Sequence, residues 1–303
     1  MSEPMANARA AATERPELAN VGKAAMNYQR AIITPGRVQF TGDKTGRLAR
    51  AWDMARRTIR IARWNLHTRA FDKATGQLFL IVDPLIQALL YFYIVYVVFG
   101  ARGEDVSYVA IFTMVTLWRG HAMIFGNAPT YLSSQITVLQ QTRYPPIALI
   151  FEGIGTDAAL FMVMNAIVLA ILALSGNGPY ITWLAYPLVL VVNLLFSSAC
   201  AVLLATLGVY LRETGIVANF VVSLWMYASP VVYGMERISE PLRTVYLWIN
   251  PFAHIMPAYR SALLQNESPQ FLPLIVIALI SLAVLVSSVT ALERLRGRIY
   301  RFL

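Results

Sequence analysis

The sequence has little charge and almost no cysteine. Charged residues make up 14% of the 303 residues, and Cys200 is the one cysteine. A single cysteine excludes an intramolecular disulfide and argues against a metal cluster. The chain also lacks a GxxxxGKS or GxxxxGKT phosphate loop, an HExxH pair and a GxSxG elbow. We therefore expect a chain that is not an enzyme, with no catalytic residue, no metal and no cofactor of its own.

What the sequence has instead is long apolar runs. Hydrophobic residues make up 57% of the chain and the mean hydropathy is +0.56. A helix needs about 20 apolar residues to cross a hydrocarbon core of about 30 Å. Six runs approach or exceed this length: Phe79–Gly100, Tyr108–Phe125, Ile147–Leu174, Thr182–Tyr210, Gly215–Tyr233 and Phe271–Leu292. The sequence therefore predicts an all-α integral membrane protein with six transmembrane helices.

The positive charge is concentrated at the two ends of the chain. The net charge is +9, and 14 of the 25 Lys and Arg residues precede Phe79. Four more follow the last run: Arg294, Arg296, Arg298 and Arg301. Basic residues that flank spans mark the cytoplasmic side. We expect both termini in the cytoplasm of a bacterial inner-membrane protein, and no nucleic-acid partner.

Four segments are predicted along the chain. Residues 1–44 are polar and Ala-rich without an apolar core, so we expect a disordered cytoplasmic tail and no cleaved signal peptide. Residues 45–75 place apolar side chains at three- and four-residue spacing and arginines on the other faces, which predicts an amphipathic helix in the headgroup layer. Residues 76–293 form the six-span domain, and residues 294–303 form a basic cytoplasmic tail.

Ionisable side chains lie inside two of the apolar runs. Arg119 and His121 follow Trp118 in the second run, and Glu152 and Asp157 lie at a similar depth in the third. A charge at mid-bilayer costs about 2.5–3.5 kcal/mol on the milder scale, so such groups pair or face water. Two interpretations remain open. The four groups form structural ion pairs, or Arg119 lies at the cytoplasmic mouth of a polar conduit.

Aromatic side chains gather toward the outer end of the first run, where Tyr91, Tyr93 and Tyr96 occur within six residues. One interpretation is an interfacial aromatic belt. The other is a track for sugar rings, whose C–H faces pack on aromatic surfaces.

Two interrupted segments separate the spans. Residues 127–142 form a short polar cytoplasmic segment, which is either a projecting helix or a plain turn. Residues 237–264 are too apolar for a free loop and are broken by Pro241, Asn250–Pro251 and Pro257. We expect two short re-entrant helices there, hinged at Asn250–Pro251. Trp248 and Arg260 would lie at the outer lip of a pathway.

Three stretches within residues 74–264 resemble the membrane permeases of ABC-2 type exporters for capsule, O-antigen and teichoic acid polysaccharides. The first holds Asp83–Pro84 in the first run, and the second leads from Trp118 to Tyr144–Pro145. The third holds Arg212–Glu213, Ser229–Pro230 and Asn250–Pro251. The Asp–Pro and Asn–Pro pairs favour the capsule branch, whereas Arg212–Glu213 favours the O-antigen and teichoic branch.

This resemblance implies a non-catalytic half-transporter. Two copies would form a homodimeric channel, and two separate subunits would bind ATP and magnesium. A lipid-linked polysaccharide, with capsular polysaccharide favoured, would be exported to a periplasmic partner. Residues 127–142 would be the coupling helix, with contacts from Tyr131, Gln135, Gln140, Gln141 and Arg143. The expected substrate pathway comprises Tyr91, Tyr93, Tyr96, Trp118, Arg119, His121, Trp248 and Arg260.

Two other classes remain as alternatives. An ABC-2 drug or lipid exporter would share the fold but have little use for a sugar-facing aromatic track. A transporter driven by an ion gradient would need Glu152 and Asp157 for coupling.

Overall fold

The computed structural model describes residues 31–34, 37–40, 56, 82, 85–98, 107–136, 139, 145–176, 178–211, 213–235 and 238–302. The chain divides into two units, Met1–Met54 and Ala55–Leu303. In the first unit, strands β1 (Ala31–Thr34) and β2 (Arg37–Phe40) form an antiparallel hairpin that pairs Ala31 with Phe40. The rest of the tail expected over residues 1–44 lies outside the described residues, and its disorder stays a prediction. The predicted interfacial helix, residues 45–75, lies outside the described residues apart from the helical Arg56.

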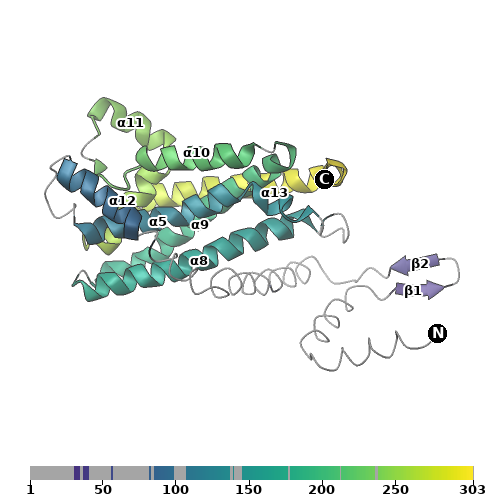
Figure 1. Ribbon diagram of the computed structural model, residues 1–303, viewed down its shortest axis with the longest axis horizontal. Coiled ribbons are helices and arrows are strands. Elements are labelled where there is room, and N and C mark those ends of the chain that lie inside the picture. The colour runs from purple at the N-terminus through teal and green to yellow at the C-terminus, as the bar shows by residue number, and fades with distance from the viewer. Residues whose placement is uncertain are drawn as a thin grey trace, which may run out of the picture. The chain divides into compact units, whose positions relative to one another are not determined.

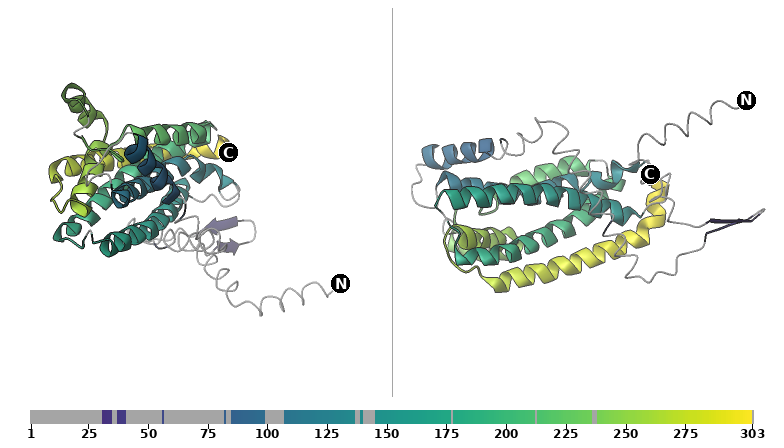
Figure 2. Two further views of the ribbon diagram at one scale, coloured as in Figure 1. Left: turned by 60° about the vertical axis from the view of Figure 1, so that its left-hand side comes forward. Right: turned by 90° about the horizontal axis from the view of Figure 1, so that it is seen from below.

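Long helices run side by side in the second unit (Figures 1 and 2). They are α5 (Tyr108–Asn127), α8 (Pro146–Leu174), α9 (Tyr186–Tyr210) and α13 (Phe271–Phe302). Each is long and apolar enough to cross a membrane, α9 together with the short helix η3 (Ile181–Ala185) before it. Pro146 begins α8, where its missing N–H costs no hydrogen bond. The all-helical membrane domain is thus confirmed in kind, with four candidate spans in the described part.

Two of the six predicted runs are not found as complete spans. The first run lies partly outside the described residues, and the fifth is shorter than predicted. The first run is helical over residues 85–98 and ends in the π-helix η1 (Tyr93–Val98). The fifth run is a helix of 14 residues, α10 (Thr214–Tyr227), after which the backbone turns at residues 228–230. At 1.5 Å per residue α10 is about 21 Å long, which is shorter than the hydrocarbon core. The count of six spans therefore stays a prediction.

The segment before α13 forms two helices, α11 (Glu240–Ile249) and α12 (Phe252–Leu263). They are separated at Asn250–Pro251, as the sequence predicts. The expected break at Pro257 is wrong, because α12 continues through this residue. Burial of Phe252, Ile255 and Tyr259, each 0% exposed, holds α12 in place despite the missing backbone hydrogen bond.

The last helix continues beyond the predicted span. Residues 294–302, predicted as a basic cytoplasmic tail, are helical and belong to α13. This stretch contains no proline, the residue that most strongly ends a helix, and its cytoplasmic location stays a prediction.

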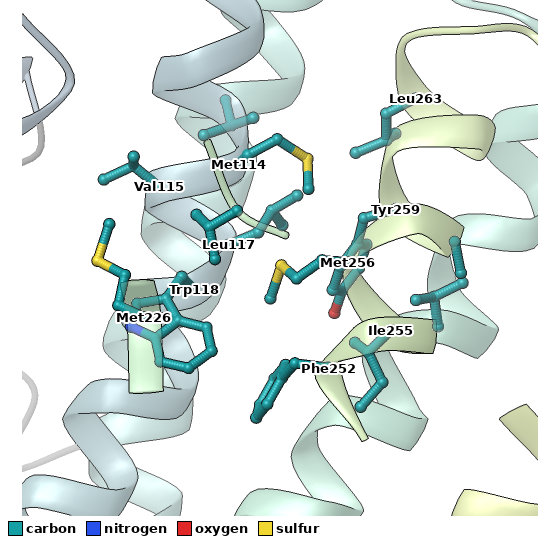
Figure 3. Close-up of a cluster of buried hydrophobic side chains, with 14 of the residues drawn as sticks. Met114, Val115, Leu117, Trp118, Met226, Phe252, Ile255, Met256, Tyr259 and Leu263 are labelled. Atoms are coloured by element: carbon teal, nitrogen blue, oxygen red, sulfur yellow. The ribbon is translucent and has the colours of Figure 1, made fainter. Parts of the chain in front are cut away.

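The core lies where α5, α10 and α12 meet (Figure 3). The Trp118 ring lies 4.7 Å from the Phe252 ring, edge to face, and the Met114, Met256 and Tyr259 side chains are fully enclosed. Close packing, rather than exclusion of water, holds helices together inside a membrane. This core fixes which face of α5 points inward and which side chains remain for a site.

The short helix α6 (Thr130–Ser133) joins the other end of α5 to the bundle. A Cβ at Gly153 would overlap the Tyr131 ring, and a Cβ at Gly208 would overlap the backbone of Pro129. Both glycines therefore permit the approach of α6 to α8 and α9.

Candidate functional site

A cavity of about 420 Å³ lies between α5, α10 and the helical residues 85–98. We call it the inner cavity. Much of its wall is polar, which is unusual for surface at the depth of a transmembrane helix. The polar side chains on it are Gln87, Tyr91, Arg119, Asn127, Asn219, Ser223 and Tyr227. This size falls within the range of ligand-binding pockets, about 300–1,000 Å³.

Arg119 supplies the positive charge of the inner cavity. It is partly buried near the middle of α5, and its Nη1 donates a hydrogen bond to Gln87 Oε1 at 2.9 Å. This bond links α5 to the helix of the first run. Arg119 therefore borders a polar space, and its place at the mouth of a conduit stays a prediction.

Tyr91, one of the expected pathway residues, lines the same cavity. Its hydroxyl lies 3.3 Å from the Tyr227 hydroxyl, and the two rings meet edge to face at 6.1 Å. Tyr93 and Tyr96 do not line the cavity, and their side chains are 55% and 43% exposed. The expected aromatic track thus has one member at the cavity and two on the outer surface of η1.

His121 lies away from the cavity, although it was expected beside Arg119 on the pathway. Its side chain is 0% exposed, and Nδ1 lies 2.9 Å from Ser197 Oγ. Rings from α5, α9, α10 and α12 surround it, the nearest being Phe252 at 4.5 Å. Arg119 and His121 are two positions apart on a helix that turns about 100° per residue. Their side chains therefore point to nearly opposite sides of α5 and reach different surroundings. The Trp118 side chain contacts both surroundings, since it packs in the core and also lines the inner cavity.

Glu152 and Asp157 are both buried on α8, and the ion pairs expected of them stay a prediction. Asp157 is 0% exposed and accepts hydrogen bonds from the Tyr131 hydroxyl at 2.7 Å and Asn127 Nδ2 at 2.9 Å. Glu152 is buried about one turn earlier, and its backbone carbonyl oxygen accepts a hydrogen bond from the Thr156 hydroxyl. Asp157 therefore ties α8 to the end of α5 and to α6.

The predicted coupling segment is described only in part. Tyr131 is 7% exposed and bound to Asp157, so it lies inside the bundle, and its part in coupling stays a prediction. Gln135 is exposed beyond α6. Gln140, Gln141 and Arg143 lie outside the described residues, and their role stays a prediction.

Trp248 and Arg260 lie at another place in the fold. Trp248 is 85% exposed on α11. Arg260 Nη2 lies 3.3 Å from the carbonyl oxygens of Val231 and Tyr233, so it holds the turn after α10 against α12. Neither residue lines the inner cavity.

Asn250 has a structural role that its position in the sequence does not reveal. Its Nδ2 donates to Ala228 O at 2.9 Å and to Ser229 Oγ at 3.1 Å. Its Oδ1 accepts from Trp225 Nε1 at 3.0 Å and from the Phe252 backbone at 3.1 Å. Two of the motifs that carry the family resemblance, Ser229–Pro230 and Asn250–Pro251, therefore meet in space.

Asn219 and Ser223 are further cavity residues that the sequence did not single out. The pattern that could have identified them is two polar side chains four positions apart, and so on one face, in an otherwise apolar helix. Among the residues that the structure describes, no cluster of His, Cys, Asp and Glu is arranged to hold a metal.

Comparison with known proteins gives one family and several relatives. The model of the ABC-2 type transporter family matches residues 59–264. The O-antigen export system permease protein RfbA of Myxococcus xanthus is 24% identical over 243 residues, which cover 78% of this chain and 92% of that protein. A protein of the same name from Klebsiella pneumoniae is 20% identical over 197 residues, with coverage of 65% and 75%.

Proposed function

Because the chain belongs to the ABC-2 type transporter family, we propose that it is the membrane subunit of an ATP-driven exporter of lipid-linked polysaccharide. Membership makes the chain a multi-pass bacterial membrane protein, with a transport role rather than a catalytic one, and implies an ATP-binding partner. Beyond family membership, we propose a cargo, a pathway and an assembly for this subunit.

The cargo is proposed from the relatives. Both RfbA proteins are named as permeases of O-antigen export. We therefore place an O-antigen type polysaccharide ahead of the capsular one that Asp83–Pro84 and Asn250–Pro251 favour. A teichoic acid remains the third candidate within the same chemistry.

The single observation that carries the pathway is the inner cavity with Arg119 on its wall. A lipid-linked polysaccharide has an anionic headgroup at the membrane and a chain of hydroxyl groups behind it. Arg119 would attract the anionic group, and the amide and hydroxyl groups of Gln87, Asn219 and Ser223 would replace water around the sugars. Tyr91 would offer an aromatic face beside them.

The assembly is proposed to be a homodimer above two ATP-binding subunits, which hold ATP and magnesium. The exposed residues after α6, with Gln135 among them, would contact these subunits. ATP-driven closure of the subunits would move α6, and the Tyr131–Asp157 bond would pass that movement to α8.

The deciding experiment deletes the gene for this chain in its host cell and measures the polysaccharide on both sides of the inner membrane. We expect surface polysaccharide to disappear while its lipid-linked precursor accumulates inside, and re-expression to reverse both changes. A partner subunit unable to hydrolyse ATP should give the same result.

Two outcomes would contradict this function. Normal surface polysaccharide together with altered drug tolerance would point to a drug or lipid exporter. Transport by the chain alone, driven by an ion gradient in vesicles without ATP, would point to a secondary transporter.

A further inference from the structure

A second cavity, of about 500 Å³, lies between α11, α12, the turn after α10 and the segment that leads into α13. We call it the outer cavity. Polar side chains dominate its wall, among them Arg243, His254, Ser261, Glu267, Ser268 and Gln270. The pathway proposed above assigns no role to these residues.

The outer cavity and α6 lie at opposite ends of the bundle. Thr182 Oγ1 donates to Ala262 O at 2.9 Å, so α12 lies beside η3, where α9 begins. The overlap that a Cβ at Gly208 would have with Pro129 places α6 at the other end of α9. The basic end of α13 also lies away from α11 and α12 (Figures 1 and 2). Since basic flanks mark the cytoplasmic side, the outer cavity opens on the exit side.

The walls of this cavity are held by bonds between separate elements. Arg260 fixes the turn after α10 through the Val231 and Tyr233 carbonyl oxygens, both at 3.3 Å. His254 Nε2 lies 3.1 Å from Leu247 O, which joins α12 to α11. The Glu267 backbone N–H donates to Ser261 O at 3.0 Å, so the chain after α12 folds back along the cavity. The cavity therefore has a defined shape in this structure.

Its polar groups include both donors and acceptors. Arg243 on α11 is paired with Glu240 at 3.3 Å, and its side chain remains 37% exposed. Glu267, Ser268 and Gln270 are exposed on the segment opposite. A guanidinium donates only, a carboxylate accepts only, and an amide does both. Sugar hydroxyl groups also donate and accept, so this mixed set matches a saccharide better than a lipid tail or a simple anion.

We propose that the outer cavity binds sugar units of the polysaccharide as they leave the channel. This inference rests on the proposed function and extends it to a saccharide site on the exit side. Binding must be weak, because a conducting pathway needs sites that its cargo can also leave. A weak site here would hold each emerging segment and disfavour its backward slip.

The test uses the intact transporter with its ATP-binding subunits in lipid nanodiscs. The probe is a labelled oligosaccharide of four to six sugars, cut from the surface polysaccharide of the host cell and free of lipid. Equilibrium binding is compared for the wild type, the double variant Glu267→Gln with Gln270→Ala, and Ser268→Trp, which fills the cavity mouth from an exposed position. Glu293→Gln, the same chemical change at the other end of α13, is the matched control.

We expect millimolar binding to the wild type, at least a fivefold loss of affinity in both cavity variants, and no change in the control. Equal affinity in all four proteins, or no binding to a wild type that exports polysaccharide in cells, would overturn the saccharide site alone. A wild type that exports no polysaccharide would instead refute the proposed function. ATP hydrolysis by each purified complex confirms that the variants are folded.

Discussion

At the scale of single residues, neighbouring positions on α5 have separate roles. Trp118 packs in the core and lines the inner cavity, His121 is enclosed by the core, and Arg119 faces the inner cavity and bonds to Gln87. The sequence marked Arg119 and His121 as ionisable groups inside an apolar run and placed all three residues on the expected pathway. It could not separate them, because their neighbours come from other helices. These are Gln87 in residues 85–98 for Arg119, and α9, α10 and α12 for His121.

The role of Arg119 predicts a graded effect of substitution. Arg119→Ala should lower polysaccharide export at least tenfold, because the anionic headgroup loses its positive partner, while Arg119→Lys should retain part of the activity. Quantified surface polysaccharide from cells with equal amounts of each protein measures this. Export by Arg119→Ala at the wild-type rate would show that the role of the arginine is structural, as in its bond to Gln87.

At the scale of elements, α6 can pack against α8 because Gly153 has no side chain. The Tyr131 ring lies where a Cβ of residue 153 would be, and its hydroxyl reaches Asp157 on the same helix. Gly215, at the start of α10, has open space around it. The two glycines therefore form a matched pair for testing the contact between α6 and α8.

Gly153→Ala should destabilise the protein by about 1–3 kcal/mol, the usual cost of overpacking, because Tyr131 must move off Asp157. Gly215→Ala should be neutral or slightly stabilising, since alanine favours helix. Thermal unfolding of both variants in the same detergent measures the difference. Equal stability would mean that α6 adapts without strain.

At the scale of the whole molecule, one chain leaves a large apolar surface exposed on α10. The side chains of Ile216, Phe220, Leu224 and Tyr227 recur every three or four residues and are 53–77% exposed. Such a stripe is covered by lipid or by protein in a membrane. The proposed homodimer would cover part of it with the second copy.

This assembly predicts a defined mass. Native mass spectrometry of the complex extracted in mild detergent should show two copies of this chain and two ATP-binding subunits. Extraction at several detergent concentrations controls for dissociation. A complex that contains a single copy of this chain under every condition would contradict the homodimer.

Membrane insertion, helical structure and family membership follow from the sequence alone. Apolar length and basic flanks are local properties that water and lipid act on directly. The motifs around Arg212–Glu213, Ser229–Pro230 and Asn250–Pro251 are read in order along the chain.

Only the tertiary structure decided which of these residues meet. It brought Asn250 onto Ser229 and Trp225, enclosed His121 in aromatic rings, bound Tyr131 to Asp157 and shortened the fifth run to α10. Both cavities are formed by residues from separate helices. The physical reason is that hydropathy fixes how deep a residue lies in the membrane, while the packing of neighbouring helices fixes the direction in which its side chain points.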